Sequence, residues 1–331
     1  MLEPIIHLLR DPVDLRQLKI AGDALVAESY VRYPILEGIP RLLAPTRTAK
    51  EETLRRKMQE FYERHTFPGY DGIDSPGVLM DKARRSNFGA WLDRAIPPMA
   101  TVLEAGCGTG QMTNFLGLVA TRTVIGVDQS AASLLLGNEF AERFGMRNVH
   151  FLQGNIFAMP IAERAADVLI CSGVLHHTPD PRSGFESLLK LVKPGGVILI
   201  GLYNRYARIP LGWRKMLFRM TGRAFHRLDA HLRRKDVDAS KKEIWFADQY
   251  RNPHESWHSV DEVLRWFDDA GVEFLSAVPA ISSGVAGEEN GISLFQKHPR
   301  GGAMEHVARQ LGWIFTISGE GGLFVLAGRK A

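Results

Sequence analysis

Three glycines at alternate positions, Gly106, Gly108 and Gly110, form the part of the sequence best suited to close contact with a ligand. An apolar run from Thr101 to Leu103 precedes them and predicts a buried strand, and residues 111–119 are typical of a helix. A glycine turn between a strand and a helix lets backbone N–H groups approach a ligand, with the helix N-terminus behind them. We therefore expect a binding site here; a glycine-rich turn without a ligand is the alternative.

The spacing of these glycines indicates the class of ligand. A dinucleotide fingerprint has the pattern Gly-x-Gly-x-x-Gly, and here its third position would be Gln111. With the acidic residue before it, the stretch instead resembles the first motif of class I methyltransferases that use S-adenosylmethionine (SAM). The resemblance implies that SAM is the cofactor and that five residues contact it, namely Glu104, Gly106, Cys107, Gly108 and Gly110.

The surrounding segments alternate between strand-like and helix-like patterns, which predicts a parallel sheet with helices on both faces. Strands are expected at residues 101–105, 121–127, 149–153, 166–171, 196–203, 272–278 and 321–327. A helix from Ser259 to Gly271 should begin with a capping box, because Glu262 follows Ser259 by three residues. The resemblance implies an α/β fold: a Rossmann-like, seven-stranded class I methyltransferase sheet with helices on both faces, a small N-terminal module and an insertion after strand five.

Polar residues at the ends of the next strands are expected to hold the adenosine part of SAM. Asp128 lies about 20 residues after the glycine turn, where a carboxylate can bind two ribose hydroxyls. Capping the following helix is its alternative role. The family usually has an aspartate at Asn155 that accepts from the adenine amino group; Asn155 can also accept, and Ile156 can flank the ring. Gln129 and Ser172 complete the expected cofactor set.

The segment from Ser172 to Asp180 resembles the fourth motif of the methyltransferase group that includes the ubiquinone and menaquinone C-methyltransferases. Its two histidines follow a strand end, where ligands bind in such sheets. For each candidate histidine, ordinary packing or capping is the alternative. The candidate catalytic residues are His176, His177, Tyr203 and His254, with His258 as a further base and Tyr250 as a further orienting hydroxyl.

The methyl carbon of SAM is already activated, so orientation supplies much of catalysis and a base is needed only where the nucleophile must lose a proton. Enzymes that methylate amino groups of adenine or glutamine usually carry Asn/Asp-Pro-Pro-Tyr/Phe after the fourth strand, where this chain has Ser172 to Leu175. Cytosine C5 methylation needs a cysteine nucleophile. Neither Cys107 in the glycine turn nor Cys171 in an apolar strand fits that role. Both acceptor classes are therefore disfavoured.

The first 45 residues resemble the small zinc-ribbon-like domain that activates some tRNA and protein methyltransferases and is fused to others. In that family a Cys-Pro-x-Cys pair binds zinc, whereas this chain has Asp11 and Asp14 at those positions and no cysteine before Cys107. A structural zinc site needs four Cys or His ligands, so we expect no metal here. An unrelated N-terminal hairpin is the alternative. Residues 46–100 are predicted to form a helical linker with one helix over residues 79–96; Tyr62 and Tyr70 are candidates for a lid on the cofactor, or for ordinary packing.

The 331-residue chain carries a net charge of +4, but the charge is unevenly distributed. Residues 203–242 hold twelve lysines and arginines against three aspartates, a net +9, which leaves −5 for the rest. No apolar run reaches the roughly 18 residues of a membrane span, and two cysteines suit a reducing cytoplasm. We predict five segments: 1–45 N-terminal module, 46–100 linker and lid, 101–203 SAM-binding core, 204–257 basic cap insertion, and 258–331 the C-terminal part of the sheet.

These features predict a SAM-dependent methyltransferase that acts on a small-molecule or lipid-like acceptor, which can be anionic. A tRNA or other nucleic-acid methyltransferase is one alternative, and a non-catalytic SAM-binding regulatory partner is another. The insertion mixes aromatic residues such as Trp213 and Phe218 with its arginines. It is expected to form a substrate lid with an anion-binding face or to lie on a membrane surface, with a solvated helix packed on the domain as the alternative. The acceptor atom, the use of a base and the oligomeric state stay open.

Overall fold

The computed structural model describes residues 2–44, 52–53, 56–57, 59–60, 63, 68–221, 229–233, 239–252, 254–283 and 293–331. Tyr62, one of the two candidate lid residues, and most of the first part of the predicted helical linker, residues 46–67, lie outside these ranges. Within them, no helix is long and apolar enough to cross a membrane.

A seven-stranded sheet forms the centre of the molecule, with strand order β10-β11-β9-β8-β5-β6-β7. Its strands are β5 (Thr101–Ala105), β6 (Thr123–Asp128), β7 (Val149–Gln153), β8 (Ala166–Ser172), β9 (Val192–Tyr203), β10 (Val272–Val278) and β11 (Leu323–Lys330). Strand β11 runs antiparallel to both neighbours, β9 and β10, and the other pairs are parallel. The predicted Rossmann-like methyltransferase sheet is confirmed.

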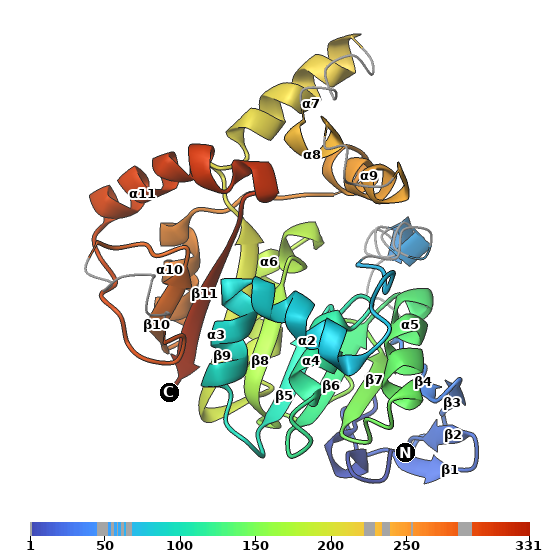
Figure 1. The fold of residues 1–331 in the computed structure, drawn as a ribbon. Coiled ribbons are helices and arrows are strands. Elements are labelled where there is room, and N and C mark those ends of the chain that lie inside the picture. Colours follow the sequence, from blue (N-terminus) through green and yellow to red (C-terminus); the bar gives the residue numbers. More distant parts are fainter. Residues whose placement is uncertain are drawn as a thin grey trace.

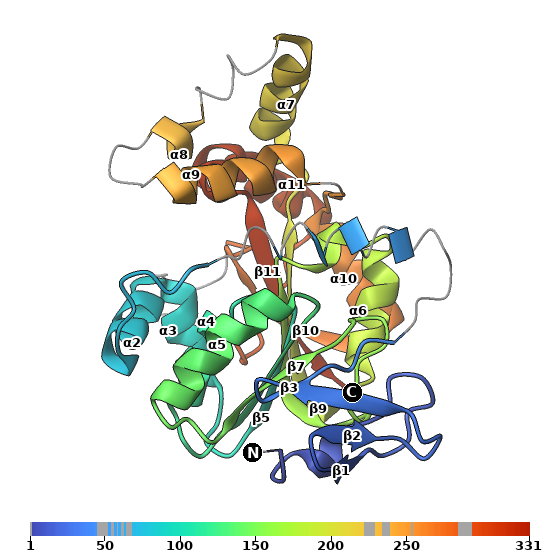
Figure 2. The same cartoon turned by 90° about the vertical axis from the view of Figure 1, so that its right-hand side faces the viewer.

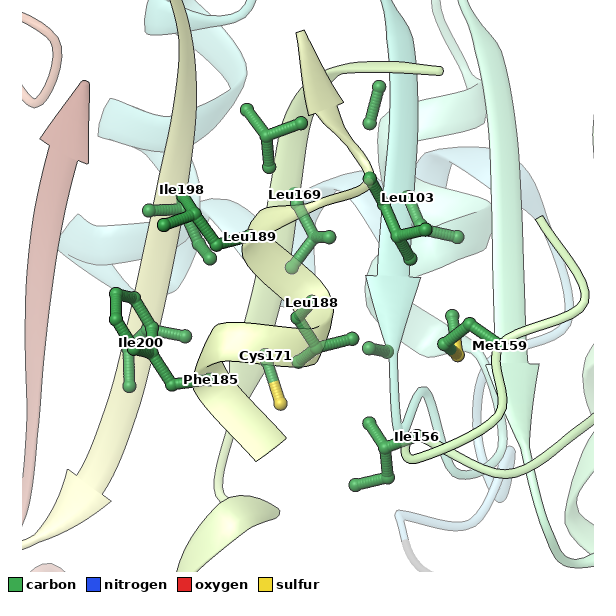
Figure 3. Packing of buried hydrophobic residues seen from close by; sticks show 14 of the residues in the cluster. Leu103, Ile156, Met159, Leu169, Cys171, Phe185, Leu188, Leu189, Ile198 and Ile200 are labelled. Atoms are coloured by element: carbon green, nitrogen blue, oxygen red, sulfur yellow. The ribbon is translucent and has the colours of Figure 1, made fainter. Parts of the chain in front are cut away.

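Helices cover both faces of the sheet (Figures 1 and 2). One face carries α2 (Pro76–Arg85), α3 (Asn87–Ala95), α4 (Gln111–Gly117) and α5 (Ala131–Arg143), and the other carries α6 (Pro181–Leu189) and α10 (Val260–Asp269). Figure 3 shows Phe185, Leu188 and Leu189 of α6 against Leu169 and Ile198 of the strands. All five side chains are buried, so this face is a continuous apolar core.

Two helix boundaries show how well local signals predicted the structure. The capping box of α10 is present, since the Ser259 side chain accepts from Glu262 N–H and the Glu262 side chain accepts from Ser259 N–H. The single helix expected over residues 79–96 is wrong, because the chain breaks at Ser86 into α2 and α3. Here α3 returns close to α2, and a Cβ on Gly89 would lie 2.4 Å from the Ala83 carbonyl oxygen. Helix α11 (Ala303–Thr316) was not predicted.

The N-terminal module is a four-stranded antiparallel sheet of β1 (Lys19–Ala21), β2 (Ala24–Val26), β3 (Arg32–Leu36) and β4 (Ile39–Pro40). It packs beside the β7 edge of the main sheet, where Leu42 N–H donates to Gln153 O at 2.8 Å. Its buried leucines, such as Leu9 and Leu25, belong to the same apolar cluster as Leu152. The module therefore shares its core with the main domain.

The two aspartates that replace the expected zinc ligands hold turns of this module. Asp11 is buried and accepts from the Tyr33 hydroxyl at 3.0 Å and from Val13 N–H at 2.8 Å. Asp14 accepts from Arg16 N–H at 2.9 Å. Among the described residues, no group of three or more His, Cys, Asp or Glu side chains is placed to hold a metal ion.

The insertion lies beyond the carboxyl ends of the central strands, at the top of Figure 1. It contains α7 (Ile209–Thr221), α8 (Ala230–Arg233), α9 (Ala239–Phe246) and a π-helical turn, Ala247–Arg251. Its two ends lie side by side: His258 N–H donates to Tyr203 O and Arg205 N–H donates to His258 O, both at 2.9 Å. The insertion is therefore a closed loop rooted at the end of β9.

Candidate active site

A cavity of about 610 Å³ lies at the carboxyl ends of β5, β6, β7, β8 and β9, with helix α2 and the insertion forming part of its wall. It collects ten of the fourteen residues that the sequence predicted for the site, drawn from five strand ends. These are Glu104, Gly106, Cys107, Gly108, Asp128, Gln129, Ile156, Ser172, His177 and Tyr203. Gly110, Asn155, His176 and His254 do not line it.

The glycine turn holds the wall of the cavity close to its neighbours. Gly106 has φ +74°, and a Cβ there would lie 2.4 Å from a methyl carbon of Val174. Gly110 has φ +70°, and a Cβ there would lie 2.3 Å from the Phe151 ring. Both positions need glycine for backbone conformation and for space. Gly110 therefore shapes the turn from behind, while Gly106 and Gly108 face the cavity.

Asp128 is held by two backbone donors at the end of β6. Its carboxylate accepts from Gly108 N–H and from Ser130 N–H, each at 2.8 Å. The N-cap of α5 is Ser130, whose hydroxyl accepts from Ser133 N–H, so Asp128 supports this cap without forming it. Burial raises the pKa of Asp128, although the backbone hydrogen bonds oppose this shift. The result is a preoriented carboxylate that faces the cavity.

Glu104 is the second acid in this half of the cavity. It accepts a short hydrogen bond from the Thr113 hydroxyl. Burial raises the pKa of Glu104 to about 7, and the nearby Asp128 charge adds to the rise. In the part of the chain that the structure describes, neither acid has an ion-pair partner. A ligand with positive charge would therefore find two uncompensated carboxyl groups here.

The remaining residues of the cofactor half, which is the half beside the glycine turn, differ in how they face the cavity. The side-chain oxygen of Gln129 is buried and has no hydrogen-bond partner in the structure, which leaves an acceptor for a ligand N–H or O–H. Ile156 contributes an apolar wall. The Asn155 side-chain oxygen accepts from Phe157 N–H at 3.0 Å, so its contact with adenine stays a prediction.

The segment before α2 covers the glycine turn with its backbone. Pro68 O accepts from the Thr109 hydroxyl at 2.5 Å, and Gly69 O accepts from the Gln111 side chain at 2.6 Å. Tyr70 instead accepts from the Asn114 amide at 2.7 Å and packs on the Phe140 ring. Tyr70 is thus a packing residue in this structure. Pro68, two residues before it, lines the cavity.

The other half of the cavity is built around Tyr203, the last residue of β9. The His176 ring centroid lies 3.8 Å from the Tyr203 centroid, and the Arg208 guanidinium carbon lies 3.7 Å from it. Two groups this close to one ring centroid cannot share a face without overlapping, so they sandwich the phenol ring. The Tyr203 hydroxyl accepts from the Gln249 amide at 3.4 Å. The phenol is therefore fixed on both faces and at its tip.

Arg208 ties this half to the insertion. It is 1% exposed, donates to Gly321 O at 2.9 Å and to the Gln249 amide oxygen, and forms an ion pair with Glu255 at 2.5 Å. Lys215 adds a second cation 3.3 Å from Glu255. Burial would raise the pKa of Glu255, but these two charges outweigh it and hold the pKa below its ordinary value. In this half the protein's own cations thus neutralise the buried Glu255 carboxylate.

One proton of the histidine pair has a defined position. The Nδ1 atom of His177 lies 2.9 Å from the carbonyl oxygen of His254, which can only accept, so His177 carries a proton on Nδ1. Its Nε2 lies 3.1 Å from Nε2 of His176. Burial lowers the pKa of His176, and the nearby Arg208 charge adds to this shift. One of the two Nε2 atoms donates to the other, and which one does so depends on the tautomer of His176. His176 acts behind the cavity wall, whereas His177 lies in it.

The other two candidate histidines, His254 and His258, do not line the cavity. His254 contributes its main-chain carbonyl to His177, and its ring is not among the lining groups. His258 bridges the Ser256 hydroxyl and the Glu262 carboxylate, at 2.8 and 2.9 Å, and so connects the end of the insertion to α10. Tyr250 donates to Asp229 at 2.9 Å within the insertion. Both cysteines are buried, and burial raises the pKa of each thiol, so neither is a ready nucleophile.

Sequence reasoning missed several residues that line the cavity. Trp245 and Gln249 of the insertion and Lys82 of α2 belong to no local motif, and Thr178 lies in the fourth motif but was not singled out. Arg208 lies behind Tyr203 and was counted only as part of a basic segment. A buried arginine five residues after a strand end has no sequence signature of its own. Only its partners Gln249 and Glu255, more than 40 residues away, show its role.

Comparison with known proteins decides the family. Residues 98–271, which contain the five strand ends beside the cavity, match a family model described as a methyltransferase domain. The chain belongs to this family. SAM is the cofactor of this methyltransferase, and the two uncompensated carboxyl groups and the unpartnered Gln129 oxygen fit a cationic, hydrogen-bonding ligand.

Two relatives and one solved structure illustrate the range of similarity. A protein of Synechococcus sp. without an assigned function is 30% identical over 53% of this chain and 47% of its own length. The ubiquinone biosynthesis O-methyltransferase of Paracidovorax citrulli is 30% identical over 36% of this chain and 50% of its own. The chain thus spans about half the length of the curated relatives it matches. The structure of PKMT2 from Rickettsia typhi, at 15% identity and a TM-score of 0.51, covers 70% of this chain and 49% of its own and shares the fold.

Proposed function

We propose that this methyltransferase transfers the methyl group of SAM to a small, lipid-like acceptor that enters the cavity beside Tyr203. SAM supplies a methyl carbon activated by its sulfonium. In our proposal the glycine turn, Glu104, Asp128, Gln129 and Ile156 hold the cofactor. The acceptor then meets the remaining wall, where apolar groups surround a few fixed polar ones.

The observation that carries this proposal is the composition of the acceptor half. Trp245, Leu323 and Val174 give it apolar walls, and Tyr203 and His177 present polar edges held by neighbours. Such a site binds a mainly apolar ligand and orients it with few polar contacts. The named function of the Paracidovorax citrulli relative is ubiquinone biosynthesis, which supports a lipid-like acceptor and a hydroxyl oxygen as the methylated atom.

Methyl-tritiated SAM can test the acceptor class directly. The protein is incubated with a total lipid extract of its own organism or with bulk tRNA, and tritium is counted in the organic phase and in precipitated RNA. We expect label in the organic phase. Label in RNA alone would move the assignment to the nucleic-acid alternative, for which the basic insertion would be the binding surface.

We further propose that the N-terminal module is a metal-free structural brace related to the activator domain it resembles, and that the protein resides in the cytoplasm. The buried Asp11–Tyr33 contact and the two buried free thiols support these proposals. Elemental analysis of protein purified without added metal should find no zinc. One zinc per chain would contradict the brace.

A further inference from the structure

Two helices at the carboxyl end of the sheet carry exposed apolar stripes. On α7 the stripe is Ile209, Trp213, Met216 and Met220, and the spacing of four, three and four residues places them on one helix face. Trp213 is 61% exposed and Met220 is 74% exposed. Leu211, on the opposite face, is the buried contact of this helix. The stripe therefore faces away from the protein.

Helix α11 repeats the arrangement. Its exposed apolar residues are Met304, Val307, Leu311 and Phe315, spaced by three, four and four residues. Met304 is 89% exposed and Phe315 is 87% exposed. The buried face of the same helix is formed by His306, Gln310 and Trp313. This helix thus has one apolar contact inside, through Trp313, and a separate apolar stripe outside.

The two helices are fixed to the same place in the fold. The Gln310 side-chain oxygen of α11 accepts from the Asn204 amide at 2.9 Å and from Val260 N–H at 2.9 Å. Asn204 lies five residues before α7 begins. Both views show the two helices at the end of the molecule where the insertion lies (Figures 1 and 2). Single exposed apolar residues are ordinary on a protein surface, but two stripes at one end indicate a binding surface.

The charge near α7 selects among possible partners. Arg205 and Arg219 are exposed, within the segment that carries a net +9, whereas Arg214 and Lys215 of the same helix pair with Asp229 and Glu255. In a symmetric dimer through this face, two such segments would meet and repel. Nucleic acid would match the charge but gain nothing from the methionines, tryptophan and phenylalanine. An anionic lipid surface matches both the charge and the apolar stripes.

We propose that α7 and α11 dock this enzyme on an anionic lipid bilayer. The stripes enter the boundary between headgroups and acyl chains, and the arginines contact the lipid phosphates. Trp245 and Gln249, which line the cavity, belong to the same insertion as α7. A docked enzyme therefore holds its acceptor half next to the bilayer. The interaction does not depend on the identity of the acceptor, so it stands apart from the proposed function.

Vesicle co-sedimentation of the full chain tests the proposal. The vesicles are phosphatidylcholine alone, or phosphatidylcholine with one quarter phosphatidylglycerol, each at low and moderate salt. We expect binding to the anionic vesicles that weakens with salt. Trp213→Ser/Met220→Ser and Met304→Ser/Phe315→Ser should each weaken it at least about tenfold. Arg205→Gln/Arg219→Gln should weaken it about fivefold per charge.

A matched control removes apolar residues at the other end of the molecule. Val13 is 66% exposed and Leu36 is 52% exposed, both in the N-terminal module, and Val13→Ser/Leu36→Ser should bind vesicles like the wild type. Calorimetric SAM binding checks that every variant is folded; if a serine variant fails this check, the arginine variant decides.

Three results would overturn the proposal. The first is no binding to anionic vesicles, and the second is equal loss of binding in the control. The third is light scattering that shows a dimer dissociated by the stripe substitutions. If the protein binds bulk tRNA in the absence of vesicles and the arginine variant loses this binding, the surface would be assigned to nucleic acid instead.

Discussion

The two halves of the cavity treat charge in opposite ways. The cofactor half contains two acids, Glu104 and Asp128, whose pKa values are raised by burial, and neither has an ion-pair partner among the described residues. The acceptor half contains Glu255, whose pKa is lowered by Arg208 and Lys215. A positively charged ligand would balance the acids of the cofactor half, whereas the protein's own cations balance the acid of the acceptor half. Ligand binding should therefore change the electrostatics of the first half far more than those of the second.

The largest effect in this comparison is expected at Arg208, in the self-neutralised half. Arg208→Met removes the cation and leaves Glu255 buried beside Lys215 alone, which should lower the free energy of unfolding by about 3–5 kcal/mol. Chemical denaturation measures the change. Because Arg208 does not line the cofactor half, the SAM affinity of the folded variant should stay unchanged.

The double variant Arg208→Met/Glu255→Gln is the matched control for this prediction. It removes the buried carboxylate that has lost its main partner and should recover most of the lost stability. A folded Arg208→Met protein that no longer binds SAM would show that the two halves are coupled, contrary to the comparison.

The next effect is expected at Asp128. Asp128→Ala removes a carboxylate held by Gly108 and Ser130 N–H, and with it the proposed pair of charge-assisted bonds to ribose. SAM and its demethylated product should both bind more weakly by about 1.5–3 kcal/mol, measured by calorimetry. Unchanged affinity for both would remove Asp128 from the cofactor site.

Glu104 and Glu255 should respond to pH with opposite signs. The Glu104 pKa rises from 4.5 to about 7 on folding, so the native state binds more protons between these pH values and stability falls as pH rises through them. Glu104→Gln should remove a loss of about 3 kcal/mol across this window, seen by thermal unfolding at several pH values. The folded Glu255 pKa is lowered, so its contribution is present above 4.5 and is lost as pH falls below it.

Adding SAM sharpens this pH comparison. The positive charges of the cofactor should favour ionised Glu104 and flatten the pH dependence of wild-type stability above pH 5. The Glu255→Gln variant, which leaves Glu104 intact, should show the same flattening. A wild-type profile that SAM leaves unchanged would mean that the cofactor's charges lie away from Glu104.

The smallest effect is expected at the Tyr203 hydroxyl. Tyr203→Phe removes the 3.4 Å contact with Gln249 but keeps the ring between His176 and Arg208, so stability should change by no more than about 1 kcal/mol. SAM affinity should be the same as in the wild type. Label transfer into the lipid extract should fall if the hydroxyl orients the acceptor, and equal transfer would leave Tyr203 a packing residue.

The cofactor half was predictable because backbone geometry builds it. Gly106 and Gly110 need positive φ and leave no room for a side chain, and Asp128 ends a strand at a fixed distance from them. These requirements act within about 25 residues and leave a readable pattern. The seven strands were predictable for the same reason, since each is a short apolar run between polar turns.

The acceptor half was not predictable in the same way because distant side chains build it. Arg208 meets Gln249, Glu255 and Gly321, and no spacing rule connects these positions. The sequence placed His176 and His177 as a pair after a strand, but it did not show that His177 lines the cavity while His176 stacks on the Tyr203 ring. The break of α2 from α3 also depends on packing, at Gly89.

The paired ends of the insertion have a consequence for how this enzyme can evolve. Both ends of the insertion are anchored at one point, by the paired backbones of Tyr203, Arg205 and His258. Doubling the length of a loop whose ends already meet costs only about 0.6 kcal/mol. The stretch between the anchors can therefore be lengthened, shortened or exchanged by recombination while the sheet beneath it stays intact. A single junction would then let one ancestral cofactor-binding core diversify its acceptors by replacing a cassette.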